Sequence, residues 1–209
     1  MSGDIILQDN VPASELSKTV FGKTLVELAK TDERIVVCEA DLMRATGTKV
    51  FRDAFPERHF NFGIAEQNMV CAAAGMAICG RIAFASTFAN FAVKRACDQM
   101  SIAAAYNLAN VKLCGHYAGL TSEKNGGTHI AVEDVAIMRA TPNMVVVEPG
   151  DVEELRQAVV ALAAHDGPAY LRIPKMYKAR VFTYEYRFVL GKAAVVHEGS
   201  DLTLCACGI

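Results

Sequence analysis

The chain has 209 residues, of which 52% are hydrophobic and 21% are charged, and its formal net charge at pH 7 is -2. This length is sufficient for one domain with a complete hydrophobic core and a smaller appended segment. A near-neutral chain lacks the basic surface that nucleic-acid binding requires, and no apolar run reaches the length of a membrane-spanning helix. We therefore expect neither nucleic acid nor a membrane among its partners.

The N-terminus and the cysteines both favour a cytoplasmic protein. The first ten residues, MSGDIILQDN, carry acids where a signal peptide has basic residues followed by an apolar run. The seven cysteines are an odd number, lie within apolar stretches and lack the spacing of a metal site. We therefore expect buried thiols in a reducing compartment.

Amphipathic and apolar segments alternate along most of the chain. Residues 16–30 have the apolar spacing of a helix, and residues 34–40 form a compact apolar run typical of a buried strand. A helix of small residues that ends at Gly80 follows. The next strands are predicted at residues 81–87, 111–117, 144–149 and 169–174. The next helices are predicted at residues 90–107, 131–140 and 151–164, the last with Asp151 as its N-cap.

Strands that are apolar on both faces and alternate with helices are typical of a parallel sheet that is covered on both sides. The sequence therefore predicts an α/β fold, with a doubly wound and mostly parallel sheet, over residues 1–175. In such sheets ligands bind beyond the carboxyl ends of the strands. We expect Asp41, residues 86–91, His116 and the loop up to His129 to meet at that edge.

The pattern changes after Pro174. Residues 176–190 are basic and aromatic without helical spacing, and we expect a linker or a short hairpin there. Residues 191–209 have the pattern of a strand, a turn and a second strand, along which Cys205 and Cys207 alternate. Because a compact domain does not end inside a strand, we expect residues 191–209 to be the start of a truncated further domain.

Glu66 is a single acid between an apolar approach at residues 60–65 and the small-residue helix. These neighbours predict a dry site, in which a carboxyl group either pairs with another group or takes up a proton. Such a group is suited to proton transfer. The alternative is an exposed acid in the first turn of a helix, where the helix dipole favours negative charge.

Four motifs follow one another in the chain: GIAEQNMVCAAAGMA, STFANF, GGTHIAVEDVAIMRATPNMVVVEPGD and AYLRIPK. In this order they resemble the pyrimidine-binding domain of transketolase, in the form found as a separate C-terminal subunit of a split enzyme. The resemblance implies a transferase that uses thiamine diphosphate to move a two-carbon ketol unit from a ketose phosphate to an aldose acceptor. Such transfers belong to carbohydrate metabolism of the pentose phosphate type.

The resemblance also implies roles at the cofactor. Glu66 matches the family's acid that activates the pyrimidine ring, and Phe91, with Phe88 one turn earlier, matches the aromatic platform under that ring. Asp41 matches an acid beside the cofactor. Without the resemblance, Phe88 and Phe91 would equally suit core packing, and Asp41 would suit a turn or a helix cap.

Further residues are implied for the substrate. His129 matches a histidine near the reacting carbonyl, with a catalytic role, and Arg172 matches an arginine that pairs with the substrate phosphate. His116 is a third candidate by its place at a strand end. The other histidines, His59, His165 and His197, are interpreted as structural.

The loop around Asn125 departs from the family pattern. Asn125 stands where the family has an acid that binds a substrate hydroxyl, and Lys124 and Arg44 add positive charge near the site. We therefore expect a donor that is a modified or more anionic sugar than an ordinary pentulose phosphate. Sequence drift in a tolerant loop is the alternative.

The sequence contains no GDG motif, with which the family binds the diphosphate and a divalent metal on a different domain. The resemblance therefore implies that an N-terminal transketolase subunit supplies that domain and holds Mg²⁺ or Ca²⁺, while this chain holds no metal. The active site would lie at the interface, in a homodimer or a heterotetramer.

Three other functions stay open at this point. The β subunit of a 2-oxoacid dehydrogenase shares the same domain and an acid like Glu66, and a deoxyxylulose phosphate synthase-like enzyme would share them too. The STFANF and GGTH motifs favour transketolase over the dehydrogenase. A noncatalytic α/β interaction subunit is the third alternative, because half of the cofactor site is missing.

Overall fold

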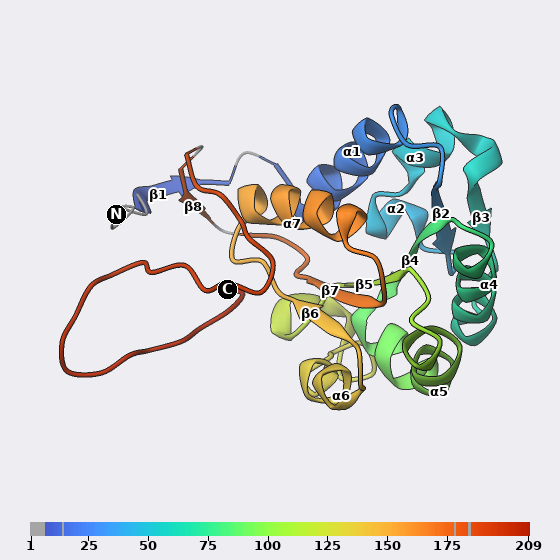
Figure 1. Cartoon of the computed structure of the whole chain (residues 1–209). Coiled ribbons are helices and arrows are strands. Elements are labelled where there is room, and N and C mark those ends of the chain that lie inside the picture. Colours follow the sequence, from blue (N-terminus) through green and yellow to red (C-terminus); the bar gives the residue numbers. More distant parts are fainter. Residues whose placement is uncertain (1–6, 14, 178, 184) are drawn as a thin grey trace.

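A computed structural model describes residues 7–13, 15–177, 179–183 and 185–209 of the chain. Its centre is a six-stranded sheet with the strand order β3-β2-β4-β5-β7-β6 (Figure 1). The strands are β2 (Ile35–Glu39), β3 (His59–Asn61), β4 (Ile82–Phe88), β5 (Val111–His116), β6 (Val145–Val147) and β7 (Ala169–Ile173). Every neighbouring pair is parallel, which confirms the predicted doubly wound α/β fold.

Helices cover both faces of the sheet (Figure 1). One face packs against α1 (Ser17–Ala29), α3 (Lys49–Ala54) and α7 (Val152–Ala164). The other packs against α4 (Glu66–Ile78), the helical segment 91–106 and α6 (Asp134–Ala140). Short helical turns are α2 (Met43–Thr46), η1 (Pro56–Arg58) and η4 (Leu120–Asn125). Strand β4 is buried throughout, with Phe84 facing the first core and Ala83 and Ala85 facing the second.

The helix predicted at residues 90–107 is present but wound more widely than expected. Two π-helical segments, η2 (Phe91–Arg95) and η3 (Met100–Tyr106), flank a single α-helical turn, α5 (Cys97–Gln99). Its inner side is made largely of alanine and is fully buried beside α4 and β5. Wide π-turns occur frequently at functional sites, and η2 begins directly after the end of β4.

Residues 176–190 were expected to be a linker or a short hairpin, and the described part of this segment contains no hairpin of its own. Instead β8 (Ala179–Phe182) pairs antiparallel with β1 (Leu7–Pro12), from the other end of the chain, as a separate two-stranded sheet. Asp151 connects this sheet to the domain. One of its oxygens caps α7 as predicted, accepting from the Glu154 N–H at 2.8 Å, and the other accepts from the N–H groups of Val181 and Phe182. The domain limits at residues 175 and 190 stay a prediction.

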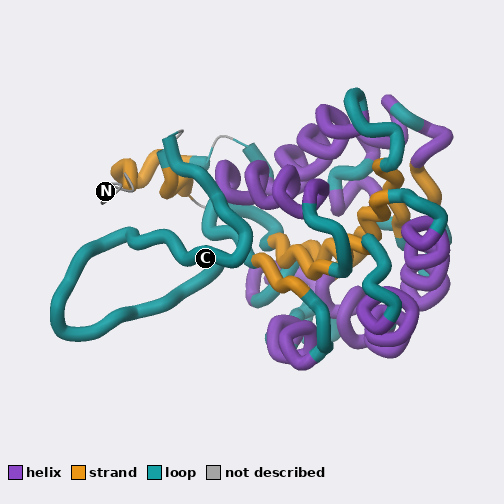
Figure 2. Tube along the Cα trace, viewed as in Figure 1, coloured by secondary structure: helices purple, strands orange, loops and turns teal. Residues whose placement is uncertain are grey.

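The two strands expected in residues 191–209 are also absent, and the segment forms an open loop (Figure 2). A strand needs a neighbour for its backbone hydrogen bonds, and no described strand runs alongside this segment. The loop returns to the domain near Glu148, whose carbonyl oxygen accepts from the Gly208 N–H at 3.2 Å.

The expectation of buried thiols holds for two cysteines and is wrong for four. Cys38 and Cys114 are buried in the sheet, and burial raises the pKa of the Cys38 thiol to about 12. Cys71 is exposed because it lies on the outward row of α4, and Cys79 is exposed at the C-terminal cap of this helix. Cys205 and Cys207 are exposed because the expected strand does not form. Among the described helices, none combines the length and apolar character needed to cross a membrane.

Glu39 is a buried acid that the sequence did not single out. It ends β2 with no exposed surface, and its Oε2 accepts hydrogen bonds from the hydroxyl groups of Thr46 and Thr48. Burial raises its pKa from 4.5 to about 7, against the lowering effect of these two hydroxyls. Glu39 therefore takes up a proton in the folded chain at pH values where the unfolded chain leaves it ionised.

We expect this proton to make stability depend on pH. Because the folded pKa is raised, the stabilising contribution is complete below pH 4.5 and is lost as pH rises towards and through about 7. In Glu39→Gln the side chain cannot ionise, so the melting temperature should fall less steeply over this range. Thermal unfolding of both forms across the range measures the slope. Glu27→Gln, at an exposed ion pair on α1, is the control, and an equal slope in Glu39→Gln would contradict the assignment.

Candidate functional site

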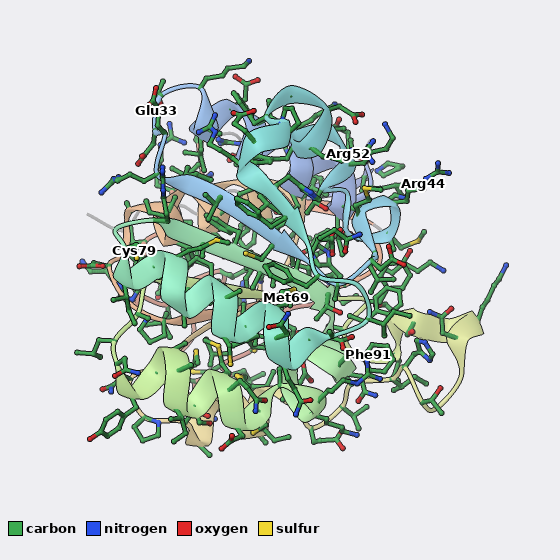
Figure 3. The ribbon with its side chains drawn as sticks, turned by 90° about the vertical axis from the view of Figure 1, so that its right-hand side faces the viewer. Glu33, Arg44, Arg52, Met69, Cys79 and Phe91 are labelled. Carbon is green, nitrogen blue, oxygen red and sulfur yellow. The ribbon has the colours of Figure 1, made fainter. Side chains whose placement is uncertain are left out.

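The carboxyl ends of β2, β4, β5 and β7 lie along one edge of the sheet and carry most of the residues singled out above. Figure 3 shows Phe91 and Arg44 on this side of the molecule, with Cys79 and Glu33 on the opposite side. The predicted meeting of strand ends at one edge is therefore present.

Glu66 begins α4 and is buried, with 1% of its side chain exposed. Its Oε2 accepts a hydrogen bond from Nη1 of Arg95 at 2.6 Å, and its Oε1 lies 3.4 Å from the Thr87 hydroxyl. The sequence predicted a dry acid that needs a partner, and the structure supplies that partner as an ion pair. Glu66 does lie in the first helical turn, but it is not the exposed acid of the alternative interpretation.

Arg95 was missed by the sequence analysis. It lies in η2 one turn after Phe91, and its Cζ is 4.4 Å from the centroid of the Phe91 ring. Its side chain is 40% exposed. Arg95 thus contacts both the buried carboxylate of Glu66 and the face of the Phe91 ring. The sequence signal that could have identified Arg95 is a cationic residue four positions after Phe91.

Four rings meet beside this ion pair, and we call Phe88, Phe91, Tyr117 and His129 the aromatic cluster. The Phe88 ring centroid lies 6.1 Å from that of Phe91, 5.8 Å from His129 and 4.8 Å from Tyr117. The His129 ring also lies edge-on to Phe91, at 5.0 Å. Three of the four rings were predicted as site residues, whereas Tyr117 was not, because a tyrosine after a strand carries no specific signal.

The loop that carries His129 is fixed at this edge by Asn90. The Asn90 amide donates to the carbonyl oxygen of Thr128 at 2.6 Å, across 38 positions of sequence. The Thr128 hydroxyl lies 2.8 Å from Nδ1 of His129. With Nδ1 engaged, Nε2 is the ring nitrogen of His129 that remains for a ligand.

Asp41 and Asn125 lie at the same edge but outside the aromatic cluster. Asp41 is an exposed turn residue with a positive φ of 62°, and it exchanges hydrogen bonds with Asn61. Asn125 is exposed at the end of η4. A turn role suits Asp41 from geometry alone, and its cofactor contact stays a prediction.

His116 is a predicted site residue that the structure buries. It is 1% exposed and packs edge-on against Phe21 of α1, with ring centroids 4.9 Å apart. Burial lowers its pKa to about 3, so the ring is neutral. The structure therefore places His116 beneath the edge rather than on it.

Arg172 is already paired within the chain. Its Nε donates to Asp134 Oδ2 at 2.7 Å, and its Nη1 donates to the carboxylate of Glu148. Tyr170 donates to the same oxygen of Asp134 at 2.7 Å. One guanidinium thus lies between two carboxylates, and a substrate phosphate would have to displace one of them. The predicted phosphate contact stays a prediction.

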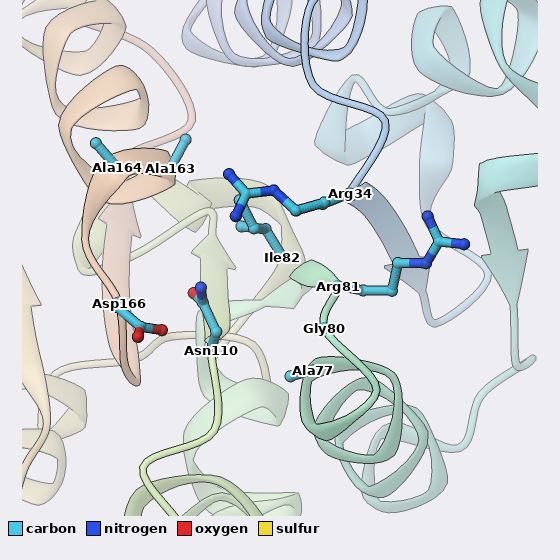
Figure 4. A pocket seen from close by; sticks show the side chains of 9 residues that line it. All are labelled: Arg34, Ala77, Gly80, Arg81, Ile82, Asn110, Ala163, Ala164 and Asp166. Atoms are coloured by element: carbon cyan, nitrogen blue, oxygen red, sulfur yellow. The ribbon is translucent and has the colours of Figure 1, made fainter.

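A pocket lies at the other edge of the sheet (Figure 4). It is lined by Arg34, Ile82, Asn110 and Asp166, which lie at the amino ends of β2, β4, β5 and β7. Because Glu66 and the aromatic cluster lie at the carboxyl edge, this pocket is not part of the candidate site.

Residues 16–178 match the family model described as "Transketolase, pyrimidine binding domain". The chain belongs to the transketolase family. This match covers both the Glu66 ion pair and the aromatic cluster, and it agrees with the resemblance drawn from the four motifs.

Two relatives of this transketolase-family chain are named as a subunit or a section of a transketolase. It is 45% identical over 185 residues to the "6-deoxy-6-sulfo-D-fructose transketolase subunit SqwH" of Clostridium sp. (strain MSTE9), a match that covers 88% of this chain and 58% of that protein. It is 43% identical over 190 residues to a protein of Methanocaldococcus jannaschii named as a transketolase C-terminal section, covering 90% and 60% of the two chains.

A solved structure titled "Split gene transketolase, inactive beta4 tetramer" matches with a TM-score of 0.78 and 42% identity. The match covers 88% of this chain and 59% of that one. The chain thus spans about three fifths of the length of the relatives it matches. It corresponds to the C-terminal section of split transketolases, and this family depends on thiamine diphosphate.

We expect the Glu66–Arg95 pair to stabilise the fold of this transketolase-family chain. Arg95→Met leaves a buried carboxylate without its cation, which should lower the free energy of unfolding by about 1–3 kcal/mol. Urea unfolding measures the change. Lys94→Met is the matched control, because Lys94 directly precedes Arg95 and forms an exposed ion pair with Glu133. This change should alter the free energy of unfolding by less than about 0.5 kcal/mol.

The double variant Glu66→Gln/Arg95→Met, compared with the two single variants, measures the interaction energy between Glu66 and Arg95. Removing the charge together with its partner should recover part of the loss, giving a favourable coupling energy in the double-mutant cycle. If Arg95→Met is as stable as Lys94→Met, the ion pair does not stabilise the fold.

Proposed function

We propose that this chain is the pyrimidine-binding subunit of a thiamine diphosphate-dependent transketolase, which transfers a two-carbon ketol unit from a ketose to an aldose. The observation that carries the proposal is the buried carboxylate of Glu66, at the carboxyl edge of the sheet and beside the aromatic cluster. The membership of the chain in the transketolase family supports it.

The residues at this edge fit the aminopyrimidine ring of the cofactor. Glu66 Oε1 has one long contact, to Thr87 at 3.4 Å, and therefore keeps the capacity to share a hydrogen bond with a ring nitrogen. Phe91 and Phe88 offer an apolar and aromatic surface for the ring. When bound, thiamine diphosphate would supply a nucleophilic carbon for reaction with a ketose carbonyl.

Five residues of the chain have separate roles in the proposed reaction. Glu66 holds the shared proton at Oε1, while Arg95 balances its charge at Oε2 and keeps the side chain in place. Phe88 and Phe91 exclude water from this proton. His129 directs Nε2 to an oxygen of the substrate, because its Nδ1 is engaged by Thr128.

The rest of the cofactor site lies on a partner in this proposal. The chain has no GDG motif, so an N-terminal subunit would bind the diphosphate together with Mg²⁺ or Ca²⁺. The match to a split transketolase whose β4 tetramer is titled inactive supports the need for such a partner. Asp41, exposed at the same edge, is proposed as a cofactor contact near that interface.

We further propose that the donor ketose is a modified or more anionic sugar than an ordinary pentulose phosphate. Asn125 and Lys124, both exposed at the end of η4, leave this part of the edge without the acid of the family pattern. The relative named as a subunit of a sulfofructose transketolase supports a sulfonated or phosphorylated sugar.

Reconstitution tests the proposed function. The chain alone, with thiamine diphosphate and magnesium, should neither bind the cofactor tightly nor transfer a two-carbon unit. Mixed with a GDG-containing N-terminal transketolase subunit, the chain should do both, as followed by calorimetry and by product formation from a panel of ketoses. Tight magnesium-dependent binding to the chain alone would place the diphosphate site here and sink the split-site proposal.

Glu66→Gln is the matched control for this assay. The amide keeps a hydrogen-bonding group of the same shape but cannot share the proton, so turnover should fall by at least ~10²-fold while assembly with the partner is unchanged. Near-normal turnover in this variant would show that Glu66 has a structural role only.

Asn125→Asp tests the proposed donor. A carboxylate is a stronger acceptor for a sugar hydroxyl than an amide is, so kcat/KM should shift towards ordinary pentulose phosphates by about 10-fold. The readout is the ratio of kcat/KM between xylulose 5-phosphate and a 6-sulfonated ketohexose. An unchanged ratio would mean that the loop does not select the donor.

A further inference from the structure

Residues 40–48 leave the end of β2 at the carboxyl edge and lead into α3, and we call them the Asp41 loop. The helical turn α2 within this loop carries Arg44, which Figure 3 shows on the same side of the molecule as Phe91. Asp41 has a positive φ of 62°, a conformation that is unfavourable for residues other than glycine. Contacts around the loop therefore hold Asp41 in this conformation.

Glu39 supplies such contacts from beneath the loop. Its Oε2 accepts from the Thr46 hydroxyl at 2.7 Å and from the Thr48 hydroxyl, both at the far end of the loop. Its backbone carbonyl oxygen accepts from the Phe62 N–H at 2.9 Å, in the segment that leads to Glu66. The side chains of Glu39, Thr46 and Thr48 are fully buried. One residue therefore ties both ends of the loop to the end of β2.

The second oxygen of Glu39 lies on the side of β4. Oε1 has no hydrogen-bond partner among the described residues. Ser86, which is fully buried, is directly opposite Glu39 in the parallel pairing of β2 with β4, so both side chains lie on the same face of the sheet. A protonated carboxyl group donates one hydrogen bond, and the Ser86 hydroxyl is the polar group that the register places beside it. These surroundings suit Glu39 in its protonated form.

The titratable and charged groups on the elements around Glu39 do not stabilise its ionised form by an ion pair. They are Asp41 after β2, Cys38 in β2, His59 in β3, Cys114 in β5, Lys18 in α1, Arg44 in α2, and Lys49 and Arg52 in α3. Asp41 raises the pKa of Glu39, burial raises the pKa of both thiols, and burial lowers the pKa of His59. Lys49 and Arg52 pair with Asp53, and Lys18 donates to the carbonyl oxygen of Arg44.

Opening of the Asp41 loop would give the Glu39 carboxyl group access to water. Burial raises the pKa of Glu39 to about 7 in the closed loop, whereas the hydrated group has the ordinary value of 4.5. Because the closed form has the higher pKa, its advantage over the open form is complete below pH 4.5 and is lost as pH rises towards and through about 7. The loop is therefore held most firmly when Glu39 carries its proton.

We propose that Glu39 is a positioning residue for the cofactor, which fixes the Asp41 loop through Thr46 and Thr48 and thereby sets the place of Asp41 at the subunit interface. The cofactor contact of Asp41 rests on the proposed function, whereas the hold of Glu39 on the loop rests on contacts within this chain. Glu39 touches neither cofactor nor substrate. Its loss should therefore change the affinity for the cofactor and not the KM of the ketose.

Hydrogen exchange in the purified chain tests the hold on the loop. In the unmodified chain, the amides of residues 40–48 should lose protection several-fold between pH 5 and pH 7, after correction for the intrinsic exchange rate. Glu39→Gln still accepts from both threonines and cannot ionise, so its protection there should be equal at the two pH values. Thr48→Val should lower this protection already at pH 5. Thr141→Val, which removes a hydroxyl group at the end of α6, is the control and should not.

Low concentrations of urea distinguish opening of the loop from unfolding of the domain. Exchange in residues 40–48 should be insensitive to urea below the unfolding transition, whereas exchange in α7 should accelerate with urea. The hold on the loop is disproved if Glu39→Gln shows the same pH dependence as the unmodified chain. It is also disproved if residues 40–48 respond to urea as α7 does, because the loop then opens only with the whole domain.

Calorimetry on the assembled complex tests the consequence for the cofactor. With an N-terminal transketolase subunit at pH 7, Glu39→Ala and Asp41→Ala should each weaken thiamine diphosphate binding by about 10-fold, as for one lost hydrogen bond to a charged group. The KM of the ketose should stay unchanged. The double variant should bind no more weakly than Asp41→Ala, and Glu39→Gln should restore the affinity. Thr48→Val replaces Glu39→Ala if the latter does not fold.

Two results separate this proposal from the proposed function. If the unmodified complex neither binds thiamine diphosphate nor transfers a two-carbon unit, the proposed function fails, while hydrogen exchange still decides whether Glu39 holds the loop. If the unmodified complex is active, an unchanged cofactor affinity in Glu39→Ala overturns the positioning role. The same holds if the losses of Glu39→Ala and Asp41→Ala multiply in the double variant, because Glu39 then does not act through Asp41.

Discussion

The Glu66 side chain is only 1% exposed, and a buried charge without a partner would oppose folding. Its described partner is Arg95, which belongs to the next helical segment along the chain. This contact requires residues 91–106 to pass directly beside α4, and the alanines on the facing sides of both helices permit that close approach. The ion pair, the wide turns of η2 and the small side chains of α4 therefore depend on one another.

The aromatic cluster is built on the same arrangement. Phe91 and Arg95 lie one turn apart in η2, so the cation that balances Glu66 also covers the Phe91 ring. Asn90 precedes this turn and holds the loop that carries His129. A shift of η2 would thus move the carboxylate's partner, the platform ring and the histidine loop together. Side chains that are coupled in this way keep the spacing on which proton transfer and substrate binding depend.

Much of the fold and part of the candidate site could be predicted from the sequence, for different physical reasons. Periodic apolar segments predict parallel strands and helices because every element must bury one face. Asp151 predicts the start of α7 because its side chain caps the helix. The pairing of β1 with β8 joins residues about 170 positions apart, and no local pattern encodes it. His116 and Arg172 were correctly placed at strand ends, yet their neighbours across the sheet decide what they do. Glu148 meets Arg172 because β6 and β7 are in register.

The carboxyl edge of the sheet contains two arginine–carboxylate groups that differ in net charge. Arg95 has one acid and remains partly exposed, so the pair is neutral and still accessible from outside. Arg172 has two acids and is largely buried, so that group repels an approaching anion in spite of its guanidinium. The sign of the electrostatic potential near each arginine therefore depends on how many carboxylates pair with it, and not on the presence of the arginine alone.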